Sequence, residues 1–192
     1  MLYFSMWLEV IEYQLHKSGV VELFAVEKKC TIPVYGVVMI VKNREEKKRI
    51  ARNILESLTD WFGVPEAREK YISEAAEQEM VVQYDDGEPV GFLCLKETGK
   101  ETVELHVMGV LKEYHRKGIG RALFNEAKEI ACLNGYLFMQ VKTVKMGKYP
   151  EYDDTNMFYI DCGFKEFEII PDLWGEANPC QIYVMYIGDV SL

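Results

Sequence analysis

The fold is decided by residues 110–123, which read Val-Leu-Lys-Glu-Tyr-His-Arg-Lys-Gly-Ile-Gly-Arg-Ala-Leu. An apolar segment ends at Val110, a basic turn follows, and Gly118 and Gly120 open a segment with helical patterning. Glycine has no Cβ, so the backbone there can turn sharply and be approached closely. The first N–H groups of a helix lack internal partners and lie at the positive end of its dipole. The stretch therefore predicts a helix start that binds an anion such as a pyrophosphate, with a simple turn as the alternative.

The composition describes a soluble globular domain of ordinary size. The chain has 192 residues, of which 49% are hydrophobic and 28% charged, so it can bury a sizeable core. Its net charge of −9 argues against nucleic acid or an anionic membrane as the main partner, because both favour a basic surface. We expect no membrane span, because no apolar run is long enough, and no signal peptide, because the apolar N-terminus lacks a basic region.

The cysteines point to a reducing compartment. There are five, an odd number, and they form no Cys-x-x-Cys pair and no cluster with histidine. A disulfide framework or a metal site is therefore not expected, and reduced thiols indicate a cytoplasmic protein.

An orderly succession of elements begins at Met39. A strand there precedes a helix capped by Asn43, and a second helix runs from Pro65 to about Gln78. The order predicts a mixed α/β, or layered α+β, fold rather than a doubly wound one. The remaining expected elements are strands at 80–84, 90–96 and 102–110, a helix from Gly120 to Asn134, a strand at 137–143, a short helix at 155–161, and strands at 164–170 and 181–187.

The first 38 residues fit this pattern poorly. We interpret residues 1–38 as an atypical N-terminal extension whose role the sequence leaves open, and residues 39–192 as the domain itself. The alternative is that translation naturally starts at Met39.

Two motifs and the order of elements resemble the GNAT superfamily of N-acetyltransferases over about residues 39–187. The acetyl-CoA loop of that family usually reads Gln/Arg-x-x-Gly-x-Gly/Ala, and residues 115–120 read His-Arg-Lys-Gly-Ile-Gly, with histidine at the Gln/Arg position. Residues 158–164, Phe-Tyr-Ile-Asp-Cys-Gly-Phe, are similar to the family's Phe/Leu-Tyr-x-x-x-Gly-Phe. The family usually has Asn seven residues before this tyrosine, where this chain has Tyr152.

The resemblance implies a GNAT fold, with a mixed central sheet and helices on both faces. It implies transfer of acetyl from acetyl-CoA to a primary amine by direct attack, with no metal, and it allows a homodimer. A non-catalytic acyl-CoA-binding or sensing domain on the same fold is the alternative. The residues that the resemblance places at the cofactor are Met108, Val110, His115, Arg116, Lys117, Gly118, Ile119, Gly120, Arg121 and Tyr152.

Amine acetylation needs a base for the amine and an acid for the departing thiolate. Alternation along the strand at 102–110 places Glu104, His106 and Met108 on one face, and the resemblance implies that Glu104 or His106 is the base. It also implies that Tyr159 is the acid and that the Val110 N–H, at a strand bulge, contacts the thioester carbonyl or pantetheine. The alternatives are that His106 is a core histidine, that Glu104 faces solvent, and that Tyr159 is a core aromatic residue.

Three variable loops carry the residues expected to bind the acceptor: Trp61, Phe62, Tyr149, Trp174 and Glu176. Aromatic walls with nearby carboxylates suit a cation, and Glu151, Asp153, Asp154 and Asp172 stand in the same loops. We therefore expect a small cationic amine, such as a polyamine or aminoglycoside, rather than a protein. The alternative is that these are ordinary loop residues, and the sequence does not identify the acceptor.

Overall fold

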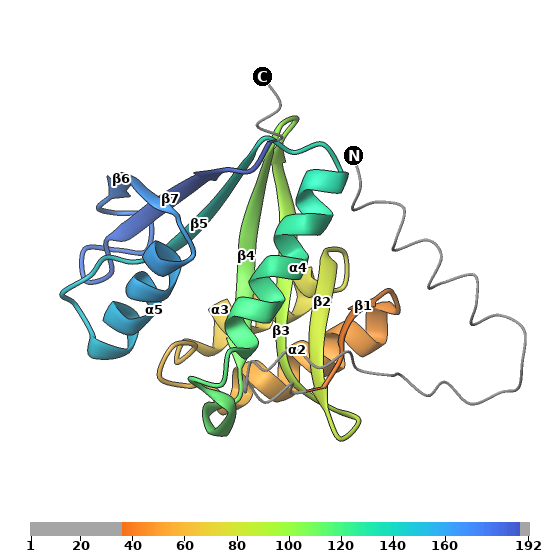
Figure 1. Cartoon of the computed structure of the whole chain (residues 1–192). Coiled ribbons are helices and arrows are strands. Elements are labelled where there is room, and N and C mark those ends of the chain that lie inside the picture. The colour runs from red at the N-terminus through yellow and green to blue at the C-terminus, as the bar shows by residue number, and fades with distance from the viewer. Residues whose placement is uncertain (1–35, 189–192) are drawn as a thin grey trace, which may run out of the picture. The chain divides into compact units, whose positions relative to one another are not determined.

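A seven-stranded sheet forms the centre of the computed structural model, which describes residues 36–188 (Figure 1). Almost all of the extension expected at residues 1–38 lies outside the described residues. The strand order is β1-β2-β3-β4-β5-β7-β6, and every neighbouring pair is antiparallel except β4 and β5, which are parallel. The strands are β1 (Val38–Val41), β2 (Glu79–Asp85), β3 (Glu88–Gly99), β4 (Thr102–Val110), β5 (Phe138–Val144), β6 (Lys165–Ile170) and β7 (Cys180–Tyr186).

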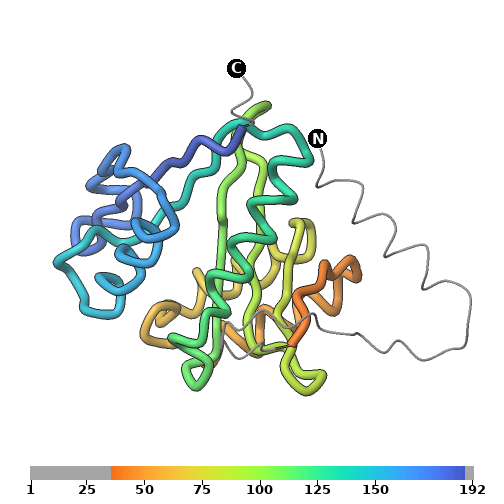
Figure 2. Tube along the Cα trace, in the orientation of Figure 1, coloured from red at the N-terminus to blue at the C-terminus, as the bar shows by residue number. Residues whose placement is uncertain are grey.

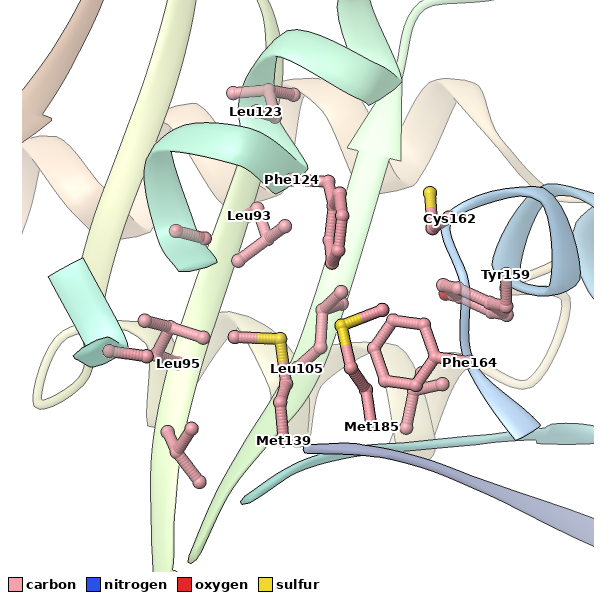
Figure 3. Packing of buried hydrophobic residues seen from close by; sticks show 14 of the residues in the cluster. Leu93, Leu95, Leu105, Leu123, Phe124, Met139, Tyr159, Cys162, Phe164 and Met185 are labelled. Carbon is pink, nitrogen blue, oxygen red and sulfur yellow. The ribbon is translucent and has the colours of Figure 1, made fainter. Parts of the chain in front are cut away.

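Helices cover both faces of this sheet, which confirms the expected fold class. One core cluster joins α2 (Arg44–Ser57) and α3 (Pro65–Ala75) to one face, and a second joins α4 (Ile119–Leu133) and α5 (Pro150–Asp161) to the other. Figure 3 shows part of the second cluster, where Phe124 of α4 and Tyr159 of α5 meet side chains of the sheet. No helix within residues 36–188 is long and apolar enough to cross a membrane.

Local sequence signals account for the ends of most elements. Asn43 caps α2, because its side-chain oxygen accepts a hydrogen bond from the Glu46 N–H at 2.9 Å. Asp86 and Gly87 have φ values of +48° and +83° between β2 and β3, which corresponds to a two-residue type I′ hairpin turn. Gly135, with a φ of +83°, follows the end of α4.

Two predicted helix boundaries are wrong. The helix expected at 155–161 begins at Pro150, because this proline occupies the first turn after an extended Tyr149. The helix expected to reach Gln78 ends at Ala75. Up to Gln78 the chain continues as a tighter turn, in which each N–H donates to the carbonyl three residues earlier.

Strands β4 and β5 separate part-way along their length. Their parallel pairing covers only Thr102–Leu105 with Phe138–Val141, although β4 continues to Val110 and β5 to Val144. The two strands diverge visibly in Figure 2. Beyond Leu105, no strand within residues 36–188 pairs with the edge of β4 that faces β5, so backbone groups on this edge are available to a ligand.

A β-bulge lies in the same part of β4. Val107 pairs with Cys94 and Leu105 pairs with Leu95, so His106 is an extra residue on the β4 side. The bulge was expected at Val110, which instead pairs with Gly91 without an interruption. The extra residue changes the alternation of side chains only for the residues that follow His106. Its effect is therefore confined to the last part of β4.

Candidate active site

A cavity of about 550 Å³ occupies the region where β4 and β5 separate. Strands β4 and β5 form part of its wall, together with helices α3 and α5. The first residues of α4, the loop before α3, Trp174 and Asn178 complete it. Because so many elements contribute, most predicted site residues come together here although they are spread over more than 110 positions of the sequence.

One end of the cavity is the beginning of α4. Gly118 precedes the helix with a φ of +83°, and the first helical hydrogen bond runs from the Ala122 N–H to the Gly118 carbonyl at 3.0 Å. The N–H groups of Ile119, Gly120 and Arg121 thus have no partner within the helix, and all three residues line the cavity. This is an electropositive cradle suited to phosphate oxygens.

Gly120 is the position where this cradle has little room for a side chain. A Cβ built there would lie 3.0 Å from Met108 Cε and 3.4 Å from two ring atoms of Phe158. The close approach of α4 to β4 and α5 therefore depends on the missing side chain.

The basic loop residues have partners of different kinds. Arg116 pairs with Asp154 at 2.8 Å, and Arg121 donates to the Asp161 carbonyl at 3.0 Å, at the end of α5. His115 Nε2 donates to the Val110 carbonyl at 2.7 Å. Lys117 is not among the lining residues, and its ammonium lies 4.8 Å from the centre of the Tyr114 ring. The prediction that Lys117 contacts the cofactor therefore has no support from its position.

Tyr159 borders the cavity from α5. It is buried, and its ring packs edge-on against Phe158 and Phe164. Burial raises the pKa of Tyr159 well above the ordinary phenol value, so the hydroxyl stays protonated. Among the described residues, no hydrogen bond uses this hydroxyl, which leaves its proton available to a ligand.

The bulge places the base candidates on a different face from Met108. Glu104 and His106 face α3, where His106 contacts Glu74, whereas Met108 packs against the core cluster of α4. The prediction that Glu104, His106 and Met108 share one face is therefore wrong for Met108, because the extra residue reverses the alternation after His106.

His106 lies between two carboxylates. Its Nε2 is 2.7 Å from Glu74 Oε2, and its Nδ1 is 3.4 Å from Glu104 Oε1. The Tyr71 ring packs at a tilt over the imidazole, with 5.3 Å between ring centres. His106 lines the cavity and its side chain is 11% exposed.

Glu104 lies behind this wall and is not among the lining residues. It forms an ion pair with Lys142, and Gln140 Nε2 donates to it at 3.4 Å. Burial alone would raise the pKa of Glu104, but the neighbouring His106 ring and the Lys142 ammonium outweigh it and lower the pKa. Of the two base candidates, only His106 can therefore meet a substrate directly.

Two of the predicted aromatic residues close the cavity on one side. Trp61 Nε1 donates to the Glu151 carbonyl and to Thr155 Oγ1, both at 3.2 Å. The Tyr152 hydroxyl donates to the Trp61 carbonyl at 2.7 Å. We call these contacts of Trp61 with Glu151, Tyr152 and Thr155 the clasp. Tyr152, which was expected at the cofactor, lines the cavity but uses its hydroxyl in the clasp.

The expected acidic rim does not form around the cavity. Trp61, Phe62 and Trp174 line it as predicted, but Tyr149 and Glu176 do not. The acidic lining residues are Glu151 and Asp154, and the basic ones are Arg68, Arg116, Arg121 and Lys142. The other loop acids fold away from the wall, and Asp153, for example, accepts a hydrogen bond from the Gly147 N–H at 2.6 Å.

Sequence reasoning missed several residues that build the site. Glu74 and Tyr71 stand one helical turn apart on α3, a spacing that could have indicated a shared contact. Asn156 is fully buried, accepts from the Tyr183 hydroxyl at 2.7 Å, and donates to the Val144 carbonyl at 2.9 Å. It thereby holds α5 against β5 and β7, three residues before Tyr159.

Comparison with known proteins adds a family match. A family model described as an acetyltransferase (GNAT) domain matches residues 76–166, which include β4, the α4 cradle and Tyr159. This part of the chain is therefore similar to the GNAT acetyltransferase domain.

Solved structures share this GNAT fold along nearly their whole length. One is a GNAT-family acetyltransferase from Desulfovibrio desulfuricans, with a TM-score of 0.68 and 19% identity over 79% of this chain and 98% of that one. Another is an aminoglycoside 6′-N-acetyltransferase complexed with coenzyme A, with a TM-score of 0.60 and 18% identity over 78% and 97%. A third is a GNAT acetyltransferase from Elizabethkingia anophelis with acetyl-CoA bound, with a TM-score of 0.57 and 17% identity over 70% and 89%.

Proposed function

We propose that this protein transfers the acetyl group of acetyl-CoA to a primary amine of a small molecule. The observation that carries the proposal is the single cavity that brings together the start of α4, the Tyr159 hydroxyl and the His106 ring. An anion cradle, an acid and a base are the parts that acetyl transfer to an amine requires.

The residues present fit the cosubstrate. The unpaired N–H groups of Ile119, Gly120 and Arg121 would hold the pyrophosphate, with Arg116 at the rim of the same cavity. The unpaired edge of β4 up to Val110 would hold the pantetheine arm by backbone hydrogen bonds. Acetyl-CoA supplies the activated carbonyl that the amine attacks. Two solved relatives in this fold hold coenzyme A or acetyl-CoA, which supports the assignment.

Two side chains would move the protons. We assign His106 as the acceptor of the amine proton, with the ionised Glu104 behind it to stabilise the resulting imidazolium. We assign Tyr159 as the donor to the departing thiolate, because its raised pKa keeps the phenol protonated. The backbone of the diverging strands would orient both reactants, which is a further contribution to the rate.

Small cationic amines are the first acceptors to test. One relative acts on an aminoglycoside, and Glu151, Trp61 and Trp174 offer a carboxylate and aromatic rings in the cavity wall. The four basic lining residues limit how much positive charge the cavity can take, so we favour amines of low charge over long polyamines.

A panel of primary amines with thiol release from acetyl-CoA as the readout tests the transfer. We expect thiol release that depends on the added amine. Acetyl-CoA binding without release by any amine would favour the non-catalytic acyl-CoA-binding alternative.

The cradle has its own test. Gly120→Ile should abolish or greatly weaken acetyl-CoA binding in calorimetry, because the new side chain fills the space between Met108 and Phe158. Gly120→Ala is the matched control, because the flexible Met108 end can move away from one methyl group. A folded Gly120→Ile protein with unchanged affinity would disprove the cofactor assignment.

A further inference from the structure

We propose that Glu74, on α3, is a positioning residue that holds His106 with its proton on Nε2 and so makes Nδ1 the atom that accepts the amine proton. The catalytic role of Glu74 rests on the proposed function. The position of the proton on the His106 ring does not, because it is a property of the folded protein. Glu74 lies outside the cavity wall, 32 positions before His106 in the sequence, and acts only through the imidazole.

The distances distinguish the two ring nitrogens. At 2.7 Å, Nε2 and Glu74 Oε2 form a short, charge-assisted hydrogen bond, whereas Nδ1 and Glu104 Oε1 are 3.4 Å apart. An ionised carboxylate can only accept, so Nε2 must be the donor. A neutral imidazole carries one N–H, and Nδ1 is therefore left with its lone pair.

Glu74 is itself held in place as a carboxylate. Its Oε2 lies 3.2 Å from Lys96 Nζ of β3, and its Oε1 lies 3.8 Å from Lys70 Nζ on the preceding helical turn. Burial would raise the pKa of Glu74, but hydrogen bonds from Lys96 and His106 outweigh it and lower the pKa. The acceptor of the Nε2 proton is thus ionised and anchored before any substrate arrives.

The surroundings of the ring also suit the protonated product. When the amine N–H bond breaks, the proton forms a new bond to Nδ1, and the amine nitrogen keeps the electron pair. The imidazolium then lies between Glu74 and Glu104, with the Tyr71 ring packed against it and Lys142 on the far side of Glu104. Its charge is therefore matched by carboxylates from α3 and β4, as in a carboxylate-oriented histidine base.

Nitrogen NMR of the imidazole rings tests the proposal without any turnover. The chain has three histidines, so ¹⁵N-histidine labelling gives few signals, and His106→Gln assigns the one of interest. We expect the neutral His106 ring to carry its proton on Nε2 in the native protein. In Glu74→Ala the proton should move to Nδ1, because Glu104 becomes the only carboxylate that the ring can reach.

Two matched variants sharpen this result. Glu74→Gln keeps an oxygen that can accept from Nε2, so it should preserve the native ring state. Glu77→Gln is the second: Glu77 lies three positions later, in the turn after α3, and pairs with Arg44, so this change should leave the ring state unaltered. A native ring with its proton on Nδ1, or a Glu74→Ala ring unchanged from native, would overturn the proposal even if one variant failed to fold.

Kinetics then connect the ring state to catalysis. We expect Glu74→Ala to lower kcat about 10²-fold with an unchanged Kd for acetyl-CoA, and Glu74→Gln to recover most of that loss. Equal kcat values for Glu74→Ala and the native enzyme would remove the catalytic role. If the native protein acetylates no amine, the proposed function fails, whereas the NMR result still decides the ring state.

Discussion

At the scale of single residues, the site depends on polar atoms that the fold leaves without partners. The Tyr159 hydroxyl is such an atom, since its ring is packed on several sides while its proton remains free among the described residues. We expect Tyr159→Phe to lower kcat by ~10²–10⁴-fold, the usual contribution of a general acid, with little change in the Kd for acetyl-CoA.

The measurement is steady-state thiol release under conditions where chemistry limits the rate. Tyr149→Phe is the matched control, because Tyr149 precedes the same helix, is 40% exposed and does not line the cavity. Native turnover in Tyr159→Phe would mean that Tyr159 is only a core aromatic.

At the scale of elements, the clasp joins α5 to the loop between α2 and α3, which lies about 90 positions earlier in the chain. Tyr152→Phe removes the hydroxyl that donates to the Trp61 carbonyl but keeps the ring. We expect it to cost about 0.5–1.5 kcal/mol of unfolding free energy, the net value of one hydrogen bond, which corresponds to a Tm lower by a few degrees.

The same change should raise KM for the acceptor more than KM for acetyl-CoA, because the clasp includes Trp61, an expected acceptor residue, and includes no residue from the start of α4. Thermal unfolding and kinetics with each substrate varied separately check both parts. An equal rise in both KM values would show that the clasp shapes the whole cavity rather than the acceptor side.

At the scale of the whole molecule, the buried Glu104 and the partly buried Glu74 link stability to pH. The pKa values of Glu74 and Glu104 are lowered in the folded protein from an ordinary value of 4.5, so the unfolded chain binds protons more readily there. Their contribution to stability is therefore fully present above about pH 4.5, and it is lost as the pH falls through the lowered values.

We expect the Tm to fall more steeply below pH 4.5 in the native protein than in Glu104→Gln, which has no carboxylate to protonate at this position. Calorimetric unfolding from pH 7 to pH 3 is the measurement. Glu129→Gln, an exposed change on α4, is the control and should follow the native curve. Parallel curves for native protein and Glu104→Gln would contradict this linkage.

Features that depend on a few neighbouring residues were predictable from the sequence. The glycine-led start of α4, the Asp86-Gly87 turn, the Asn43 cap and the bounds of β4 all follow from local backbone chemistry. The mixed sheet with helices on both faces followed from the order of these elements and from the family resemblance.

The tertiary structure alone decided how the site is assembled. One extra residue in β4 turned Met108 toward α4 and away from the face that Glu104 and His106 share, which no alternation rule reveals. Glu74 reaches His106, and Lys142 reaches Glu104, across 32 and 38 positions of the chain. Sequence patterns report the local preferences of the backbone, whereas contacts of this kind arise only when β3, β4, β5 and α3 pack together. That packing also decided which loop acids line the cavity: Glu151 and Asp154 do, whereas Asp153, Asp172 and Glu176 do not.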